Sequence, residues 1–159
     1  MSFLLTVAAS SMLLCAPFYD ETAEAYGYRN CDGGVGLAAR FYAAEPFNAC
    51  GIAVVMDLDG VRIINRQGET LVHPMVFDNG ADPFSEGLAR YVEDGKYGYF
   101  DKCGKVAIPA QYDFALPFKN GKARAGYDCT FPTVPPSGEY HSYECQRWVE
   151  LDHPVGSSD

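Results

Sequence analysis

The sequence is poor in basic residues and has no long hydrophobic run. Its 159 residues include 12 Lys and Arg against 21 Asp and Glu, a formal net charge of −9 at pH 7. Nucleic acids and anionic membrane surfaces are bound through clusters of Lys and Arg, so this composition disfavours both partners. The main apolar run, residues 3–14, is 12 residues long and too short to cross a bilayer. We therefore expect no nucleic-acid partner and no membrane span in the mature chain.

Familiar catalytic and metal-binding motifs are also missing. The sequence has no G-x-S-x-G, P-loop, H-E-x-x-H or C-x-x-C pattern. Residues 34–39 fit a dinucleotide-binding pattern, but no hydrophobic strand precedes them. Residues 57–60 begin like a calcium loop, yet Gly68 stands where that loop needs its final glutamate, so a turn explains them better. We expect no cofactor, no metal and no catalytic residue; an enzyme with an unrecognised hydrolase-like site is the alternative.

The first 25 residues are typical of an export signal. The apolar run at 3–14 is followed by a polar stretch that ends in Ala23-Glu24-Ala25, an A-x-A cleavage pattern. No Lys or Arg precedes the run, so a buried helix is the alternative. Lipid attachment at Cys15 is disfavoured because the preceding Leu14 is bulky. The sequence predicts a helical signal peptide at 1–25 and a periplasmic or secreted protein.

Residues 45–152 repeat themselves. Residues 83–90 and 117–124 share Pro, Phe, Gly, Ala and Arg at an offset of 34, and residues 45–53 repeat the theme with one extra residue. Asp94-Gly95 lies between apolar runs and indicates a hairpin, because both turn residues tolerate positive φ. The sequence therefore predicts an all-β fold of tandem antiparallel β-hairpin repeats, about three units long. The predicted division is a signal peptide at 1–25, an N-terminal extension at 26–44, the repeat domain at 45–152 and a flexible tail at 153–159.

One phenylalanine recurs in each unit. Phe47, Phe84 and Phe118 follow the repeated Pro and hold equivalent positions. A single hairpin is marginally stable, so neighbouring units must stack to bury such residues. Burial of one Phe contributes about 2–3 kcal/mol. We predict that all three are buried in a shared core.

Residues 83–118, PFSEGLARYVEDGKYGYFDKCGKVAIPAQYDFALPF, resemble the WG repeat, a tandem β-repeat common in bacterial proteins. The family pattern runs Pro-Phe-Ser-Glu-Gly-Leu-Ala, Trp-Gly-aromatic-Ile-Asp, Gly-Lys-hydrophobic-Val-Ile-Pro and Tyr-Asp. The Trp-Gly pair stands here as Tyr97-Gly98, with Arg62-Ile63 in the first unit and Trp148-Val149 in the last. We assign Tyr97, Gly98 and Trp148 to the core of the repeat. The resemblance implies an all-β repeat fold with a binding or scaffolding role, and it supplies no catalytic residue.

The last unit contains a Pro-rich insertion at residues 130–138, where the previous unit has its Asp-Gly turn. Long loops on a rigid scaffold often carry function, and a tolerated surface insertion is the alternative. If the loop is functional, Phe131, Tyr140 and Tyr143 would face a partner. The predicted role is a non-catalytic extracytoplasmic repeat protein with a protein or cell-envelope partner; a cytoplasmic scaffold with reduced thiols is a further alternative.

Cysteine pairing follows from the hairpins and from export. Cys129 and Cys145 end the two strands that flank the insertion, and adjacent antiparallel strands bring facing side chains within reach of a disulfide. Cys31 and Cys50 are predicted to pair and tie the extension to the first unit. Loss of Cys15 with the signal peptide leaves an odd number of cysteines, and Cys103 is the predicted unpaired thiol because residues 102–105 read as an exposed turn flanked by charge.

Overall fold

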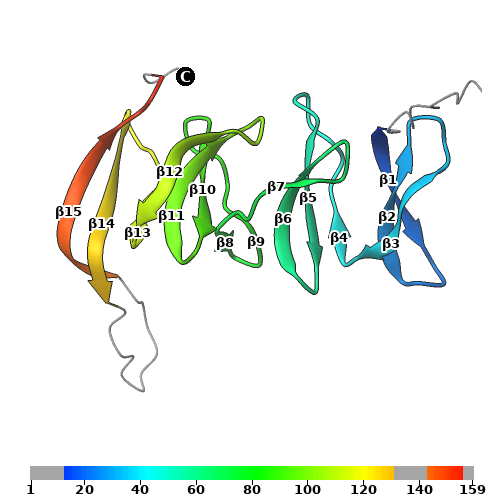
Figure 1. The fold of residues 1–159 in the computed structure, drawn as a ribbon, viewed down its shortest axis with the longest axis horizontal. Coiled ribbons are helices and arrows are strands. Elements are labelled where there is room, and N and C mark those ends of the chain that lie inside the picture. The colour runs from blue at the N-terminus through cyan, green and yellow to red at the C-terminus, as the bar shows by residue number, and fades with distance from the viewer. Residues whose placement is uncertain (1–12, 131–142, 156–159) are drawn as a thin grey trace, which may run out of the picture.

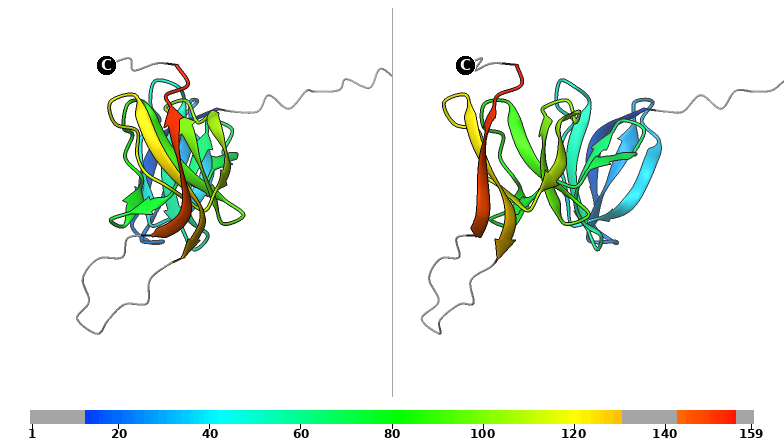
Figure 2. Two further views of the ribbon diagram at one scale, coloured as in Figure 1. Left: turned by 90° about the vertical axis from the view of Figure 1, so that its left-hand side faces the viewer. Right: turned by 60° about the vertical axis from the view of Figure 1, so that its left-hand side comes forward.

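The computed structural model describes residues 13–130 and 143–155, and all of its regular elements there are strands. Four small antiparallel sheets follow one another along the long axis of the molecule, from β1 in blue to β15 in red (Figure 1). Viewed along that axis the sheets overlap, and in an oblique view they stand face to face (Figure 2). The predicted all-β antiparallel fold is confirmed.

Each sheet defines one unit. Unit A contains β1 (Leu14–Asp20), β2 (Ala25–Asn30) and β3 (Val35–Phe41). Unit B contains β4 (Ala43–Ala44), β5 (Ile52–Asp57), β6 (Gly60–Asn65) and β7 (Thr70–Val72). Unit C contains β10 (Leu88–Glu93), β11 (Lys96–Asp101) and β12 (Val106–Tyr112). Unit D contains β13 (Phe114–Ala115), β14 (Lys122–Thr130) and β15 (Glu144–Asp152). A separate hairpin of β8 (Val76–Phe77) and β9 (Gly80–Ala81) lies between units B and C.

The Asp-Gly pair forms the tight turn that the sequence predicts. In unit C, Glu93 faces Lys96, so only Asp94 and Gly95 connect the two strands. Their φ angles are 49° and 74°, the left-handed conformation that such a two-residue turn requires at both positions. In unit D the matching strands pair as far as Thr130↔Glu144, and the insertion lies between these two residues in the sequence.

Apolar cores fill the three interfaces between the units. An inner sheet is buried on both faces, so neighbouring residues of one strand serve different interfaces. Phe100 packs toward unit B, whereas Tyr99 packs toward unit D. This explains why the strands read as continuous apolar runs instead of a clean alternation. Large buried residues at the successive interfaces are Tyr28, Phe41 and Val55, then Ile63, Tyr91 and Phe100, then Tyr99 and Phe118.

Residues 13–25, predicted as the end of the signal peptide, are part of the first sheet in this structure. Strand β1 pairs with β2 from Leu14↔Asn30 to Asp20↔Ala25. Leu14 is 3% exposed, and its N–H donates to the carbonyl of Arg66 in unit B at 2.8 Å. A cut after Ala25 would remove a paired strand from unit A. The helix predicted for the N-terminal apolar run is not supported: residues 1–12 lie outside the described part of the chain, and Leu14 begins a strand.

Most of the predicted N-terminal extension at 26–44 is also part of unit A, and its last residues form β4 of unit B. Tyr26–Phe47 aligns without a gap with Tyr97–Phe118, at an offset of 71 residues. Strands β2 and β3 take the places of β11 and β12. The array therefore has four sheets, one more than the three units that the sequence predicts.

Two sequence assignments are corrected by the structure: the Trp-Gly position of unit B and the start of the C-terminal tail. Met56 pairs with Val61 as Val92 pairs with Tyr97, so Val61-Arg62 occupies the Trp-Gly position of unit B, not the predicted Arg62-Ile63. Within the predicted flexible tail, His153 is only 9% exposed. Its ring contacts the carbonyl of Glu86 through Nε2 at 2.7 Å.

The glycine of the repeat lies beneath an aromatic ring of the neighbouring strand. Gly98 pairs with Tyr91, and a Cβ added to Gly98 would stand 2.6 Å from the Tyr91 ring and 2.5 Å from the carbonyl of Ile108. Gly27 pairs with Phe18 in the same way, with a distance of 2.8 Å to that ring. Glycine is required here because both a ring and a backbone approach it closely.

Units B and D have no glycine at this position and no aromatic partner either. Arg62 faces Val55, and Val149 faces Ala125. In units A and C, an aromatic residue on the first strand faces glycine on the second strand. In units B and D, a smaller residue on the first strand faces a residue with a side chain on the second. The Gly of the motif is explained by this steric exchange.

Replacing Gly98 with Val should lower the free energy of unfolding by about 1–3 kcal/mol, because the site cannot hold a side chain beside Tyr91. The double variant Tyr91→Ala, Gly98→Val copies unit D, and part of the stability lost in Gly98→Val should return. Chemical denaturation of the two single variants and the double variant gives the coupling energy. Additive effects would contradict the steric exchange.

Candidate functional site

The three repeated phenylalanines have different surroundings, which corrects the prediction that all are buried. Phe118 is 1% exposed, with its ring 4.9 Å from that of Tyr99. Phe47 is half-buried, 5.1 Å from the ring of Tyr28. Phe84 is 38% exposed. Unit C therefore presents to solvent an aromatic residue that the repeat can bury elsewhere.

The exposure of Phe84 follows from a substitution in the preceding unit. Tyr28 and Tyr99 cover the next phenylalanine, and each hydroxyl donates at 2.7 Å to the carbonyl before the repeated Pro, that of Glu45 or Leu116. Burial raises the pKa of both tyrosines. Unit B has Ile63 at the position of Tyr99. The register shows this, because Ile63 pairs with Val54 as Tyr99 pairs with Arg90. Without a covering tyrosine, Phe84 packs edge-on against Phe100 of its own unit, at 5.4 Å.

The β8–β9 hairpin adds further exposed apolar residues beside Phe84. Its turn residues Asp78 and Asn79 have φ angles of 47° and 65°, as a tight two-residue hairpin turn requires. Val76 is 56% exposed and Phe77 is 54% exposed. The hairpin interrupts the spacing of the repeats, and its apolar side chains are not part of any inter-unit core.

Phe77 and Phe84 line one of two neighbouring hollows, which together we call the side groove. A hollow of about 220 Å³ is lined by Phe77, Asp82, Pro83, Phe84, Ser85, Arg90 and Pro117. A hollow of about 620 Å³ is lined by Ser85, Leu116, Pro117, Phe118, Lys119, Lys122, Ala123 and Arg124. Both hollows are lined by Ser85 and Pro117, so they lie side by side across units C and D.

A buried ion pair forms part of the groove's lining. The side chains of Asp82 and Arg90 are 2% and 6% exposed, and their closest N–O distance is 2.6 Å. The Asp82 carboxylate also accepts the backbone N–H of Arg90, while the Arg90 guanidinium donates to the carbonyl of Ala115 at 3.0 Å. Both charges are satisfied inside the protein, so this pair fixes units C and D relative to each other and leaves little charge for a ligand.

Basic side chains border the larger hollow. Lys119 and Arg124 are exposed, and the Arg124 guanidinium lies 4.5 Å from the centre of the Trp148 ring. Lys122 bonds to Asp152 and lies 3.4 Å from Glu150; the hydrogen bond to Asp152 raises its pKa.

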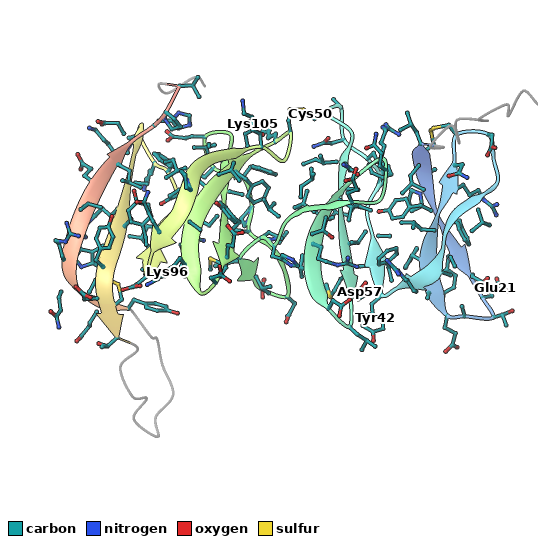
Figure 3. The ribbon with its side chains drawn as sticks, in the orientation of Figure 1. Glu21, Tyr42, Cys50, Asp57, Lys96 and Lys105 are labelled. Carbon is teal, nitrogen blue, oxygen red and sulfur yellow. A yellow bond between two sulfur atoms is a disulfide. The ribbon has the colours of Figure 1, made fainter. Side chains whose placement is uncertain are left out.

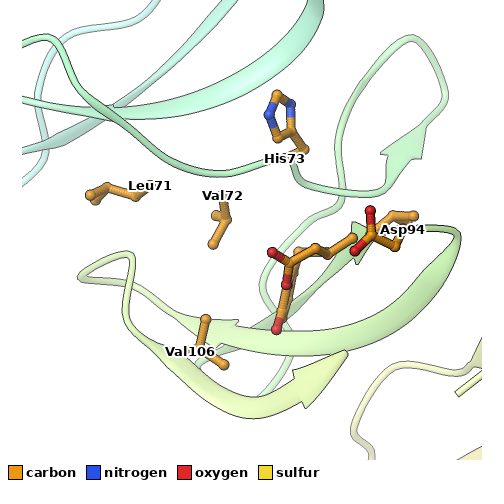
Figure 4. A pocket seen from close by; sticks show the side chains of 8 residues that line it. Leu71, Val72, His73, Asp94 and Val106 are labelled. Atoms are coloured by element: carbon orange, nitrogen blue, oxygen red, sulfur yellow. The ribbon is translucent and has the colours of Figure 1, made fainter. Parts of the chain in front are cut away.

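A second pocket lies between units B and C (Figure 4). It has a volume of about 330 Å³ and is lined by Leu71, Val72, His73, Tyr91, Val92, Glu93, Asp94 and Val106. In the described part of the chain, no hydrogen bond or ion pair joins the His73 ring to Glu93 or Asp94. A catalytic histidine is normally oriented by such a partner. The pocket therefore shows an exposed histidine near two acids without the geometry of a catalytic dyad.

All six cysteines are paired, two of them as predicted. Cys129 pairs with Cys145 across the two strands of unit D. The predicted pairing of Cys31 with Cys50 is wrong, because Cys31 bonds to Cys15 in unit A. Cys50 bonds instead to Cys103, which the sequence analysis left as a free thiol. Cys50 and the β11–β12 turn, marked by Lys105 in Figure 3, lie at the same end of units B and C.

The predicted partner loop is only partly described. Phe131 and Tyr140 lie outside the described residues. The Tyr143 ring stacks on Phe114 at 4.2 Å, and burial together with Tyr143 raises the pKa of Tyr97 to about 12. Trp148 and Tyr97, predicted as core residues, are half-buried and contact the same Phe114 ring edge-on.

Two negative findings concern the described residues 13–130 and 143–155 alone. They contain no helix of the length and hydropathy needed to cross a membrane. They also contain no group of three or more Cys, His, Asp and Glu side chains arranged to hold a metal ion.

Comparison with known proteins identifies the repeat. The family described as "WG containing repeat" matches residues 63–97 and 97–128. Each match runs from the second strand of one sheet to the next unit, so a sequence repeat spans two sheets. No curated protein and no solved structure matches the chain. Tyr26–Phe47 continues the same pattern upstream of the matched residues. The chain therefore contains WG repeats, at residues 63–128.

Proposed function

We propose that this protein is a non-catalytic binding module of an oxidising, extracytoplasmic compartment, and that the side groove is its binding surface. The observation that carries the proposal is the exposure of Phe77 and Phe84 at the groove. Both lie where the repeat is interrupted or altered, and large exposed apolar residues that the fold does not need are typical of interaction sites.

The proposed compartment is supported by the cysteines. Disulfides form and persist in secreted and periplasmic proteins and are rare in the cytosol. Three pairs at bonding distance account for every cysteine in the sequence. A cytoplasmic scaffold with reduced thiols would gain nothing from this pairing.

The enzyme alternative has less support. Its candidate groups are His73, Glu93 and Asp94 at the pocket between units B and C. Catalysis by such groups needs a base within hydrogen-bond reach of an orienting partner and a reacting atom. The side groove offers a larger hollow with an apolar floor, which suits recognition.

Replacing Phe77 and Phe84 with Ser should weaken ligand binding without unfolding the protein, because both side chains are exposed. Phage-displayed linear peptides of about 12 residues, selected on the wild-type protein, supply the ligands. The double variant should weaken their binding by at least about tenfold, as measured by fluorescence anisotropy.

Leu58→Ser is the matched control. Leu58 is 90% exposed at the β5–β6 turn and does not line the groove, so this variant should bind like the wild type. Equal binding of the selected peptides to the wild type and the Phe77→Ser, Phe84→Ser variant would overturn the proposed function.

A further inference from the structure

Uncompensated positive charge stands at one end of the side groove. Three basic residues and no acid line the larger hollow. Lys122 is already engaged with Glu150 and Asp152. Lys119 and Arg124 have no carboxylate within ion-pair distance among the described residues. Glu150 faces Arg124 across the β14–β15 pair but forms its ion pair with Lys122, so Lys119 and Arg124 are the two cations left to meet a ligand.

This local charge opposes the net charge of the protein. The chain has 21 acids and 12 bases, so a positive hollow is unlike the average surface. Glu86, in the neighbouring turn, accepts the N–H of Gly121 at 3.1 Å and does not line the hollow. At physiological salt, charges are screened beyond about 8 Å, so acids on distant units have little effect on a ligand at Lys119 and Arg124.

Arg124 is preorganised to bind a carboxylate. Its guanidinium lies against the face of Trp148, 4.5 Å from the ring centre. Stacking on an aromatic face fixes the plane of the guanidinium, while its N–H edges stay able to donate two parallel hydrogen bonds. Exposed Lys119 stands in the same hollow and can pair with a second carboxylate.

The other end of the groove is apolar. Phe77, Phe84 and Pro83 line the smaller hollow, whose only charged residues are the mutually paired Asp82 and Arg90. The two hollows adjoin at Ser85 and Pro117 and are open to solvent, a shape that suits an extended peptide better than an enclosed acyl chain. An extended chain advances about 3.3 Å per residue and directs alternate side chains to the same side.

We infer that the side groove binds an extended acidic peptide, with apolar side chains over Phe77 and Phe84 and carboxylates at Lys119 and Arg124. The inference rests on the proposed function and adds the chemistry of the ligand.

The test uses labelled peptides of defined charge. The probe is a fluorescein-labelled peptide of about ten residues, with alternating Phe and Pro in one half and Glu in the other, prepared in both chain directions. Matched peptides have Gln or Lys in place of Glu. In anisotropy titrations of the full chain, the Glu peptide should bind at least about tenfold more tightly than the Gln peptide in about 0.05 M NaCl. The difference should shrink in about 0.5 M NaCl.

Charge reversal locates the carboxylates. Lys119→Glu, Arg124→Glu should weaken binding of the Glu peptide by at least about tenfold and favour the Lys peptide. Lys119→Glu alone should shift binding in the same direction; its side chain has no bond in the structure that the substitution would break. Lys102→Glu, Lys105→Glu changes the net charge equally on the exposed β11–β12 turn and should leave binding unchanged.

The outcomes separate this inference from the proposed function. Equal binding of the Glu and Gln peptides, with both lost in the Phe77→Ser, Phe84→Ser variant, would overturn acid recognition and leave the binding site standing. Binding that survives that variant would overturn the proposed function itself. If phosphatidylglycerol vesicles bound through Lys119 and Arg124 while no peptide bound, the peptide ligand would be ruled out.

Discussion

Replacing Asp82 with Ala is expected to lower the free energy of unfolding by about 3–5 kcal/mol, because it leaves the buried guanidinium of Arg90 without its carboxylate. Asp82 accepts three hydrogen bonds from Arg90, one from the backbone N–H and two from the guanidinium. With side-chain exposures of 2% and 6%, water cannot replace them. Urea denaturation followed by tryptophan fluorescence measures the change, since Trp148 lies in adjacent unit D.

An exposed ion pair provides the control. Lys96 and Asp113 bond to each other, with side-chain exposures of 48% and 25%. Lys96→Ala should cost no more than about 1 kcal/mol, as is usual for exposed pairs. Asp82→Ala, Arg90→Met removes both charges and should recover much of the lost stability. A loss below about 1 kcal/mol in Asp82→Ala would contradict the assigned role of the pair.

The repeat could be predicted from sequence wherever its side chains follow the family pattern. Asp94-Gly95 marks its hairpin directly, because few other residues adopt positive φ in two successive positions. Unit A was missed because its apolar first strand follows a hydrophobic run and reads as part of an export signal. The aligned Tyr26-Gly27-Tyr28 and Tyr97-Gly98-Tyr99 are the signal that could have identified it.

The candidate site could not be predicted in the same way, because it arises from departures from the repeat. Equivalent positions predict equal burial, but burial of Phe84 depends on the residue that covers it. Ile63 lacks the ring and hydroxyl of Tyr28 and Tyr99, and this difference lies in another unit. The sequence also gives no reason for Val76 and Phe77 to form a separate hairpin with exposed side chains.

Disulfide pairing shows the same limit. Cys129 and Cys145 lie on paired strands, so the local hairpin argument finds them. Cys50 and Cys103 belong to different units, 53 residues apart in sequence. Their proximity depends on how two sheets stack, which the repeat pattern does not specify. The sequence analysis assigned Cys15 to the signal peptide and so left an odd number of cysteines, whereas Cys15 pairs with Cys31 in the structure.

Removing the Cys50–Cys103 disulfide is expected to lower the free energy of unfolding by about 4 kcal/mol. The bond closes a loop of 53 residues, and the entropy that a cross-link removes from the unfolded chain grows with loop length. The variant Cys50→Ser, Cys103→Ser tests this. The matched variant Cys129→Ser, Cys145→Ser opens a loop of 16 residues and should lose about 3 kcal/mol.

The Cys50–Cys103 bond should also decide whether the array unfolds as one body. It is the disulfide that joins two units; the other two each lie within a single unit. In a linear stack each unit is stabilised by its neighbours, so cooperativity depends on the weakest interface.

Without the bond, units A and B should separate from units C and D before either pair unfolds, and the denaturation curves of different probes should no longer coincide. Hydrogen exchange should then show earlier loss of protection for Tyr91 and Phe100, at the interface between units B and C, than for Tyr28 between units A and B. A single coincident transition in the Cys50→Ser, Cys103→Ser variant, with the stability loss of the Cys129→Ser, Cys145→Ser variant or less, would show that packing alone holds units B and C together.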